Sequence, residues 1–210
     1  MTRLPGLYDK LSPYEQWKRL PGRIFLDSDV VQFLSDFGQF IFEGHKEDKS
    51  SLKSSNGKVI TDTSRLFREI EALKDIFIHI DRANFEFAIS ETTYKEKVFN
   101  DPQKRLTSWL DSINSHWNSV LKSYSQPFSE ESEVRFIEAT KDARLISNLS
   151  DSDRMIVLDA IKFDCRGLLT VDHFADERIQ EYFYEKYKLM VMWPTDFIKI
   201  LGPFQALYNG

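Results

Sequence analysis

The sequence predicts an α/β fold, a three-layer α/β/α sandwich around a mainly parallel sheet with helical insertions. Short apolar runs of strand length alternate along the chain with longer segments of helical periodicity. The strand-like runs are too apolar for a sheet with one exposed face, which favours parallel strands covered by helices on both sides. A chain of 210 residues, 41% of them hydrophobic, is enough for one enlarged domain with a substantial core.

The first elements follow from punctuation and periodicity. Residues 1–22 carry three prolines and predict an N-terminal extension, with at most a helical turn, before a single domain at 23–205. The apolar run at 23–26 ends on Asp27 and predicts a buried strand. Apolar residues then recur at helical spacing up to Gly44, which predicts a helix directly after the strand.

The middle of the chain alternates polar and amphipathic segments. Residues 45–63 are polar and serine-rich and predict a flexible loop. A helix is predicted at 64–81 and a strand at 84–90. We interpret 100–148 as a helical insertion. It contains an amphipathic helix at 102–124, a polar loop at 125–133 and a following segment that fits either a strand or a helix.

The last third predicts further strands and helices. Ser150 or Ser152 caps a helix at 150–164, whose apolar run begins at Met155. The remaining elements are a strand, a helix, a strand stopped by proline and a short helix, at 166–172, 173–188, 189–194 and 195–202.

Composition excludes several classes of protein. The net charge of −5 is unlike a typical nucleic-acid binder, although acids clustered around a metal can coexist with local basic patches. Cys165 is the single cysteine, so an intramolecular disulfide and a thiolate zinc site are excluded. No signal-peptide core occurs at the start, and no run reaches the roughly 18 apolar residues of a membrane span. We therefore expect a soluble, cytoplasmic protein without a membrane partner.

Acidic residues stand at the boundaries of the predicted elements. They are Asp27, Asp29, Glu91, Asp151, Asp153 and Asp172. The carboxyl ends of parallel strands meet at one edge of a sheet, where α/β proteins bind their ligands. Close carboxylates repel one another unless a cation neutralises them, and Mg²⁺ or Mn²⁺ prefers oxygen ligands. The competing interpretation is that Asp29, Asp151 and Asp153 only cap helices.

Four stretches together resemble the PIN domain, a family of metal-dependent nucleases: RIFLDSDVVQFL, FAISETTYKE, DSDRMIVLDAIKFDCRGLLTVDHF and YKLMVMWPTDFIKIL. The resemblance implies that four acids hold Mg²⁺ or Mn²⁺ and carry the catalysis, namely Asp27, Glu91, Asp153 and Asp172. It makes five neighbours auxiliary: Ser28, Asp29, Asp151, Thr170 and Asp176. Glu86 and Glu96 are alternatives to Glu91, and Asp151 is an alternative to Asp153. The family's usual Asp-Thr-Asn is Asp-Ser-Asp in this chain.

The resemblance implies an endoribonuclease that hydrolyses phosphodiester bonds of RNA, of the kind found as toxins or defence nucleases. RNA is then the expected substrate, and an inhibitor protein or antitoxin and a second copy of the chain are expected partners. Two alternatives remain open. FLDSDVV also fits the opening motif of haloacid dehalogenase-like phosphatases, with Asp27 as nucleophile. A PIN-like scaffold that binds RNA or protein without catalysis is the other.

Overall fold

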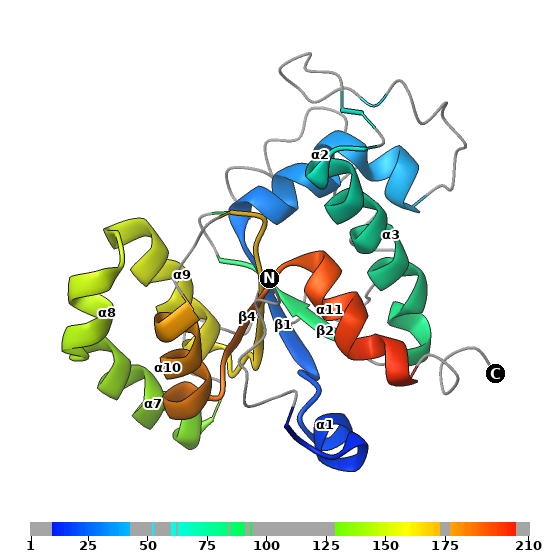
Figure 1. Cartoon of the computed structure of the whole chain (residues 1–210). Helices are drawn as coiled ribbons and strands as arrows, with labels where there is room; N and C mark the ends of the chain where they lie inside the picture. Colours follow the sequence, from blue (N-terminus) through cyan, green and yellow to red (C-terminus); the bar gives the residue numbers. More distant parts are fainter. Residues whose placement is uncertain are drawn as a thin grey trace.

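The computed structural model has a mixed α/β fold built on a four-stranded, fully parallel sheet (Figure 1). The described residues are 10–42, 52, 60–61, 63–83, 85–90, 93, 129–172 and 177–204. Within them, the predicted α/β class and the parallel sheet are confirmed.

The strands are short and the helices carry most of the described chain. The strands are β1 (Arg23–Leu26), β2 (Glu86–Ala88), β3 (Gly167–Leu169) and β4 (Met190–Met192). The helices are α1 (Pro13–Lys18), α2 (Ser28–Phe42), α3 (Arg65–Ala83), α7 (Glu130–Thr140), α8 (Ala143–Asn148), α9 (Asp151–Lys162), α10 (Glu177–Tyr187) and α11 (Pro194–Leu201), followed by the 3₁₀ turn η2 (Gly202–Phe204). Among these described helices, none combines the length and apolarity needed to cross a membrane.

The strand order is β2-β1-β3-β4, and the register aligns the last residues of three strands. Leu26 pairs with Leu169, which lies in turn beside Met192. The backbone ladder continues one residue further, since the N–H groups of Asp27 and Thr170 donate to the carbonyls of Leu169 and Met192, each at 3.0 Å. We call the line formed by Asp27, Thr170 and Trp193, directly after β1, β3 and β4, the carboxyl edge.

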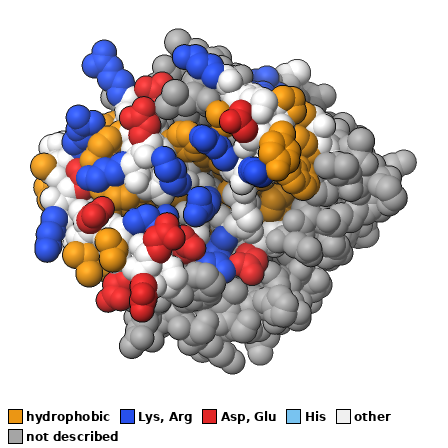
Figure 2. Space-filling model, turned by 90° about the horizontal axis from the view of Figure 1, so that it is seen from below, with side chains coloured by type: hydrophobic (Ala, Val, Ile, Leu, Met, Phe, Trp, Pro, Cys, Tyr) orange, Lys and Arg blue, Asp and Glu red, His pale blue; other side chains and the backbone are white. Residues whose placement is uncertain are grey.

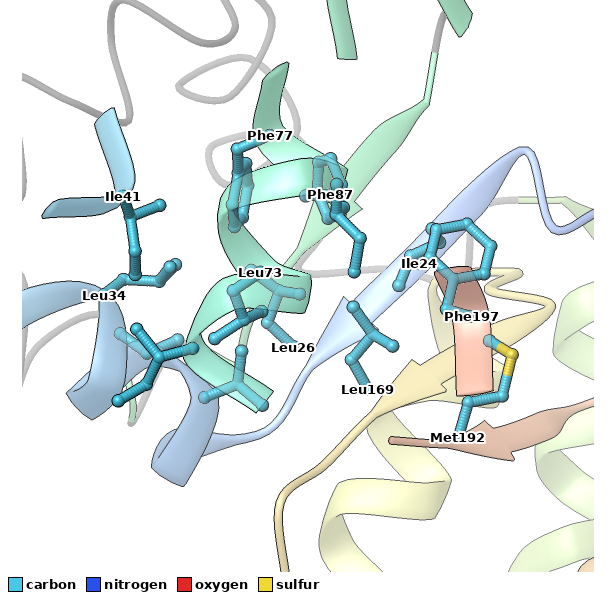
Figure 3. Packing of buried hydrophobic residues seen from close by; sticks show 14 of the residues in the cluster. Ile24, Leu26, Leu34, Ile41, Leu73, Phe77, Phe87, Leu169, Met192 and Phe197 are labelled. Atoms are coloured by element: carbon cyan, nitrogen blue, oxygen red, sulfur yellow. The ribbon is translucent and has the colours of Figure 1, made fainter. Parts of the chain in front are cut away.

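Helices cover both faces of the sheet, and the arrangement fits an α/β/α sandwich. Successive strand residues point to opposite faces: Ile24 and Leu26 enter one core with α2, α3 and α11, while Phe25 enters a second core with α7, α8, α9 and α10. Figure 3 shows the first core, where Leu26 and Leu169 meet side chains of the covering helices. Burial of both faces explains why the strands are apolar apart from Arg23 and Glu86, which stand at the amino ends of β1 and β2.

One prediction from the sequence is wrong in the second helical layer, and one alternative left open is decided there. The polar segment predicted as a loop at 125–133 already contains the start of α7, because Ser129 and Ser132 cap its first turn reciprocally. The ambiguous segment after it is helical throughout, as α7 and α8. The apolar run of α9 is buried only in part, since Met155 is exposed whereas Val157 lies in the core.

Two predicted peripheral segments contact the domain where they are described. In the predicted loop at 45–63, Leu52 and Ile60 are buried in the first core, and the Ile60 N–H donates to the Leu52 carbonyl at 2.7 Å. In the predicted extension at 1–22, Trp17 of α1 packs edge-on against Phe204. Residues 45–51, 53–59 and 62 of the loop, and residues 1–9, lie outside the described residues.

Candidate functional site

The strand order creates a switch point between β1 and β3. The chain leaves β1 through α2 and α3 on one face and reaches β2, whereas α7, α8 and α9 on the other face precede β3. Connections from neighbouring strands to opposite faces leave a crevice beyond the carboxyl ends of those strands, which is where α/β sheets bind ligands. Asp27 and Thr170 stand directly at this point.

Asp27 is a buried carboxylate with hydroxyl partners on both oxygens. Its side chain belongs to a residue that is 4% exposed. The Thr170 hydroxyl donates to Oδ2 at 2.8 Å, and the Ser28 hydroxyl donates to Oδ1 at 3.2 Å. Among the described residues, no Lys, Arg or His forms an ion pair with Asp27, so its negative charge is not balanced there.

The electrostatic result is a carboxylate that resists ionisation. Burial raises the pKa of Asp27 above its ordinary value, and the nearby Asp29 adds to the rise, while the hydrogen bond from Thr170 opposes it. Burial also raises the pKa of Glu69, but that side chain caps α11 by accepting from the Thr195 N–H and hydroxyl at 3.0 Å. A raised pKa is therefore shared by Asp27 and Glu69. What distinguishes Asp27 is its position at the switch point.

Asp172 reaches the same edge through the backbone. Its N–H donates to the Thr170 hydroxyl at 3.2 Å, and that hydroxyl in turn donates to Asp27. One side chain thus links the chain beyond β3 to the buried carboxylate beside it. The side chain of Asp172 is exposed, so this residue combines a place near Asp27 with access to solvent.

The acids that open α9 are engaged in contacts within its first turn and with its cap, Ser150. The Asp153 carboxylate accepts from the Ser150 hydroxyl at 2.7 Å, and its N–H donates to the same hydroxyl at 3.1 Å. Asp151 is exposed and pairs with Arg154 at 2.9 Å. Of the two predicted caps, Ser150 and Ser152, the structure shows Ser150. Since α9 runs antiparallel to the strand that follows it, its first turn faces the carboxyl edge, but the contacts of both acids stay within that turn.

The remaining predicted residues divide into three groups. Asp29 is exposed in the first turn of α2. Glu86, an alternative to Glu91, lies at the amino end of β2 and pairs with Arg23 at 2.5 Å, away from the carboxyl edge. Glu91 and Asp176 lie outside the described residues, as does Glu96.

The donor set fits a hard divalent cation in kind. Asp27 and Asp172 supply carboxylate oxygens, and Mg²⁺ is commonly held by one or two carboxylates with waters completing its shell. Within the described ranges, no group of three His, Cys, Asp or Glu side chains is close enough to hold a metal ion. The described residues therefore do not by themselves form a complete protein cage for a metal ion.

A mixed-charge pocket of about 550 Å³ lies beyond β4 on the same edge. Its lining residues are Arg65, Arg68, Glu69, Trp193, Thr195, Asp196 and Lys199. The Arg65 guanidinium stacks over the Trp193 ring, 3.2 Å from its centroid. Lys199 pairs with the buried Asp196 at 3.1 Å. Sequence reasoning missed this pocket; its only local signal was the pair of arginines at the start of the predicted 64–81 helix.

The pocket is close to the switch point. Trp193 follows β4, and β4 is the strand beside β3, so two strand spacings separate it from Asp27. That corresponds to about 10 Å between backbones. Asp27 and Thr170 are not among the residues that line the pocket.

No family model, curated protein or solved structure matches this chain. The likeness to the PIN domain rests on the four sequence stretches. The structure adds a parallel sheet with Asp27 at its switch point.

Proposed function

We propose that this protein is a PIN-like, Mg²⁺- or Mn²⁺-dependent endoribonuclease that acts at the carboxyl edge of its sheet. The observation that carries the proposal is Asp27, a buried carboxylate at the switch point whose charge no described cation balances. Such a carboxylate costs stability, and binding a cation there offsets the cost.

Each residue at the edge has a distinct task in this proposal. Asp27 and Asp172 bind the cation, together with Glu91 and Asp153 as the family resemblance implies. Thr170 and Ser28 fix the orientation of the Asp27 carboxylate through hydrogen bonds of 2.8 and 3.2 Å. The bound cation supplies activation of water and stabilisation of charge on the phosphate. Asp29, Asp151 and Asp176 add negative charge around the site.

The mixed-charge pocket suits the phosphate backbone of the substrate. Glu69 is used to cap α11 and Asp196 is paired with Lys199, which leaves Arg65 and Arg68 as cations turned to the pocket. Proteins that bind single-stranded nucleic acid combine cations with aromatic rings, and Trp193 lies beside Arg65. The preference for RNA, and an antitoxin, an inhibitor or a second copy as partner, follow from the family resemblance.

The test is cleavage of a fluorescently labelled single-stranded RNA in Mn²⁺, in Mg²⁺ and in EDTA. We expect cleavage with either metal, none in EDTA, and a rate reduced at least about 100-fold in Asp27→Asn. Glu138→Gln is the matched control, because this acid is exposed on α7 in the opposite helical layer. Cleavage that persists in EDTA, or equal rates in the wild type and Asp27→Asn, would reject the proposal.

The same experiment separates the alternatives. If RNA is not cleaved and beryllofluoride forms an adduct with Asp27, the phosphatase alternative is indicated. RNA binding without turnover, unchanged in Asp27→Asn, would indicate a scaffold. Helix α2 begins at Ser28, directly after Asp27. No other segment stands between Asp27 and this helix, which argues against the phosphatase.

A further inference from the structure

A second pocket, of about 220 Å³, lies at the opposite, amino edge of the sheet. Its lining residues are Lys18, Arg19, Arg166, Tyr184 and Lys188. We call this set the basic pocket. Figure 2 views this side of the molecule and shows Lys and Arg side chains gathered across the middle of the face.

Four cations reach the basic pocket from three separate segments. Lys18 and Arg19 end α1, Arg166 precedes β3, and Lys188 follows α10. No carboxylate belongs to the lining. Since like charges that converge repel one another, this arrangement is unfavourable unless an anion neutralises it. It is the more notable in a chain whose net charge is −5.

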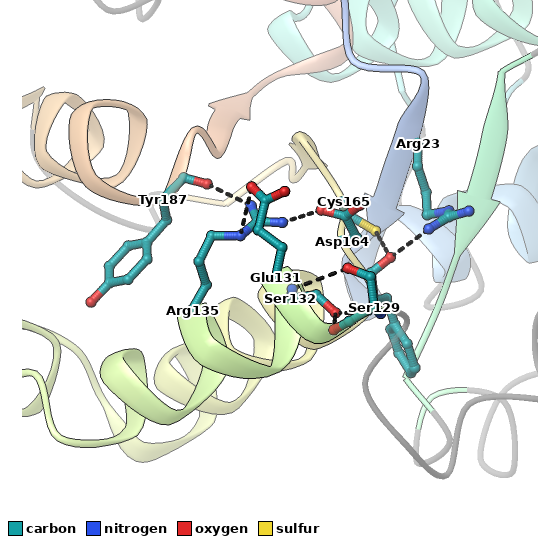
Figure 4. Close-up of polar contacts among 9 residues, drawn as sticks. Arg23, Ser129, Glu131, Ser132, Arg135, Asp164, Cys165 and Tyr187 are labelled. Atoms are coloured by element: carbon teal, nitrogen blue, oxygen red, sulfur yellow. Dashed lines mark hydrogen bonds and ion pairs between the residues drawn. The ribbon is translucent and has the colours of Figure 1, made fainter.

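Carboxylates near the amino edge are already paired. Asp164, two residues before Arg166, forms an ion pair with Arg135 of α7, as Figure 4 shows. Glu86 is paired with Arg23. These two acids therefore do not cancel the charge of the basic pocket. Glu15 of α1 accepts from the Ser12 hydroxyl, and its charge offsets that of Lys18 and Arg19 only in part, leaving Arg166 and Lys188.

The capping of helices explains part of this cluster but not all of it. Cations are favourable at helix carboxyl ends, and the Lys188 ammonium donates to the Glu185 carbonyl at 2.9 Å. Lys188, however, has a φ of 57°. Its N–H and that of Leu189 donate to carbonyls of the last turn of α10, as at the carboxyl end of a helix, where glycine is the usual residue. The chain thus has a lysine at a position whose left-handed backbone conformation disfavours any residue with a side chain. Arg166 does not end a helix at all.

Tyr184 adds a neutral donor. Its ring is buried, and its hydroxyl oxygen accepts from Arg19 at 3.0 Å. Among the described residues the hydroxyl proton has no acceptor of its own, so it can donate to an anion in the pocket.

We propose that the basic pocket binds a phosphate group. Arginine and lysine with a hydroxyl are the donors that hold phosphate oxygens. The volume is below the 300–1,000 Å³ of pockets for drug-sized ligands, which favours a small group such as a phosphate. That group belongs either to a small nucleotide or to the backbone of a nucleic acid. The proposal is independent of catalysis at the carboxyl edge.

The test is calorimetric titration in EDTA at low salt with three probes: inorganic phosphate, uridine 5′-monophosphate and a 12-nucleotide RNA. We expect saturable binding that weakens about tenfold or more in Arg166→Gln/Lys188→Gln, which removes two charge-assisted hydrogen bonds. Lys141→Gln, at an exposed lysine after α7, is the control for the loss of a surface cation away from the pocket and should bind as the wild type does. Binding of phosphate and the monophosphate identifies a small ligand, and binding of the RNA alone identifies a backbone phosphate.

A second variant guards against misfolding. Tyr184→Phe keeps the buried ring and the net charge and removes only the hydroxyl, so we expect a several-fold loss of affinity for the same probe. Circular dichroism checks that each variant is folded. The proposal fails if none of the three probes binds saturably, or if Tyr184→Phe and a folded double variant both bind with wild-type affinity.

Discussion

Two aspartates are buried to nearly the same extent in this molecule and are treated in opposite ways. Asp27 at the carboxyl edge is 4% exposed, and Asp142 at the start of α8 is 6% exposed. Burial acts to raise the pKa of each. The pKa of Asp27 is raised above its ordinary value, whereas that of Asp142 is held well below it.

The partners of the two carboxylates explain the difference. Asp142 accepts from the Lys186 ammonium at 2.6 Å, from the Tyr187 hydroxyl at 2.5 Å, from the Tyr182 hydroxyl and from the Arg144 N–H at 2.9 Å. These hydrogen bonds outweigh the effect of burial on its pKa. Asp27 has hydroxyl donors and, among the described residues, no cation.

The comparison separates a structural carboxylate from a candidate functional one. Asp142 caps α8 and ties it to α10, so its charge is fully used within the fold. Asp27 keeps a charge that the described fold does not neutralise. Perturbed titratable groups of that kind gather at functional sites, where stability is given up for function.

The largest effect is expected at Asp142. Replacement by Asn removes the charge that Lys186 and the two tyrosines share, and we expect the free energy of unfolding to fall by about 3 kcal/mol. Urea denaturation measures it. Asp151→Asn, at an exposed carboxylate on α9, should change the same quantity by less than about 0.5 kcal/mol. A loss at Asp142 no larger than this control would show that the network does not stabilise the fold.

The pH dependence of stability gives the next effect. Because the folded pKa of Asp142 is depressed, its contribution is present above the unfolded pKa of about 3.9 and is lost as pH falls through the folded value. The wild type should therefore lose stability more steeply than Asp142→Asn below about pH 4. Thermal melts across this range measure the difference. Parallel curves for the two proteins would contradict the low pKa of Asp142.

How far the sequence predicts these sites depends on whether the contacts are local. The sequence points to Asp27 because this residue directly ends an apolar strand. It points to a cap at Ser150 or Ser152 because caps precede their helices, and the structure selects Ser150. The contact between Asp27 and Thr170 required the strand order, in which β3 lies beside β1 although much of the chain separates them. The basic pocket joins three distant segments, and no spacing rule connects Arg19, Arg166 and Lys188.

The smallest effect is the most telling, because its sign is opposite to that at Asp142. Because the pKa of Asp27 is raised in the folded state, the folded protein is destabilised by the Asp27 charge at a pH above that pKa. This destabilisation is absent below the pKa of the unfolded state. Without metal at neutral pH, Asp27→Asn should therefore melt at the wild-type temperature or slightly above it; each kcal/mol corresponds to roughly 2–4 °C in a chain of this size.

Added Mn²⁺ should reverse that order. A cation that binds only the folded state raises the melting temperature of the wild type and not that of Asp27→Asn. Differential scanning fluorimetry with and without Mn²⁺ measures both shifts. If Asp27→Asn is as damaging as Asp142→Asn and Mn²⁺ has no effect on the wild type, Asp27 is a second structural carboxylate. In that case the carboxyl edge loses the feature that distinguishes it from the helical layer.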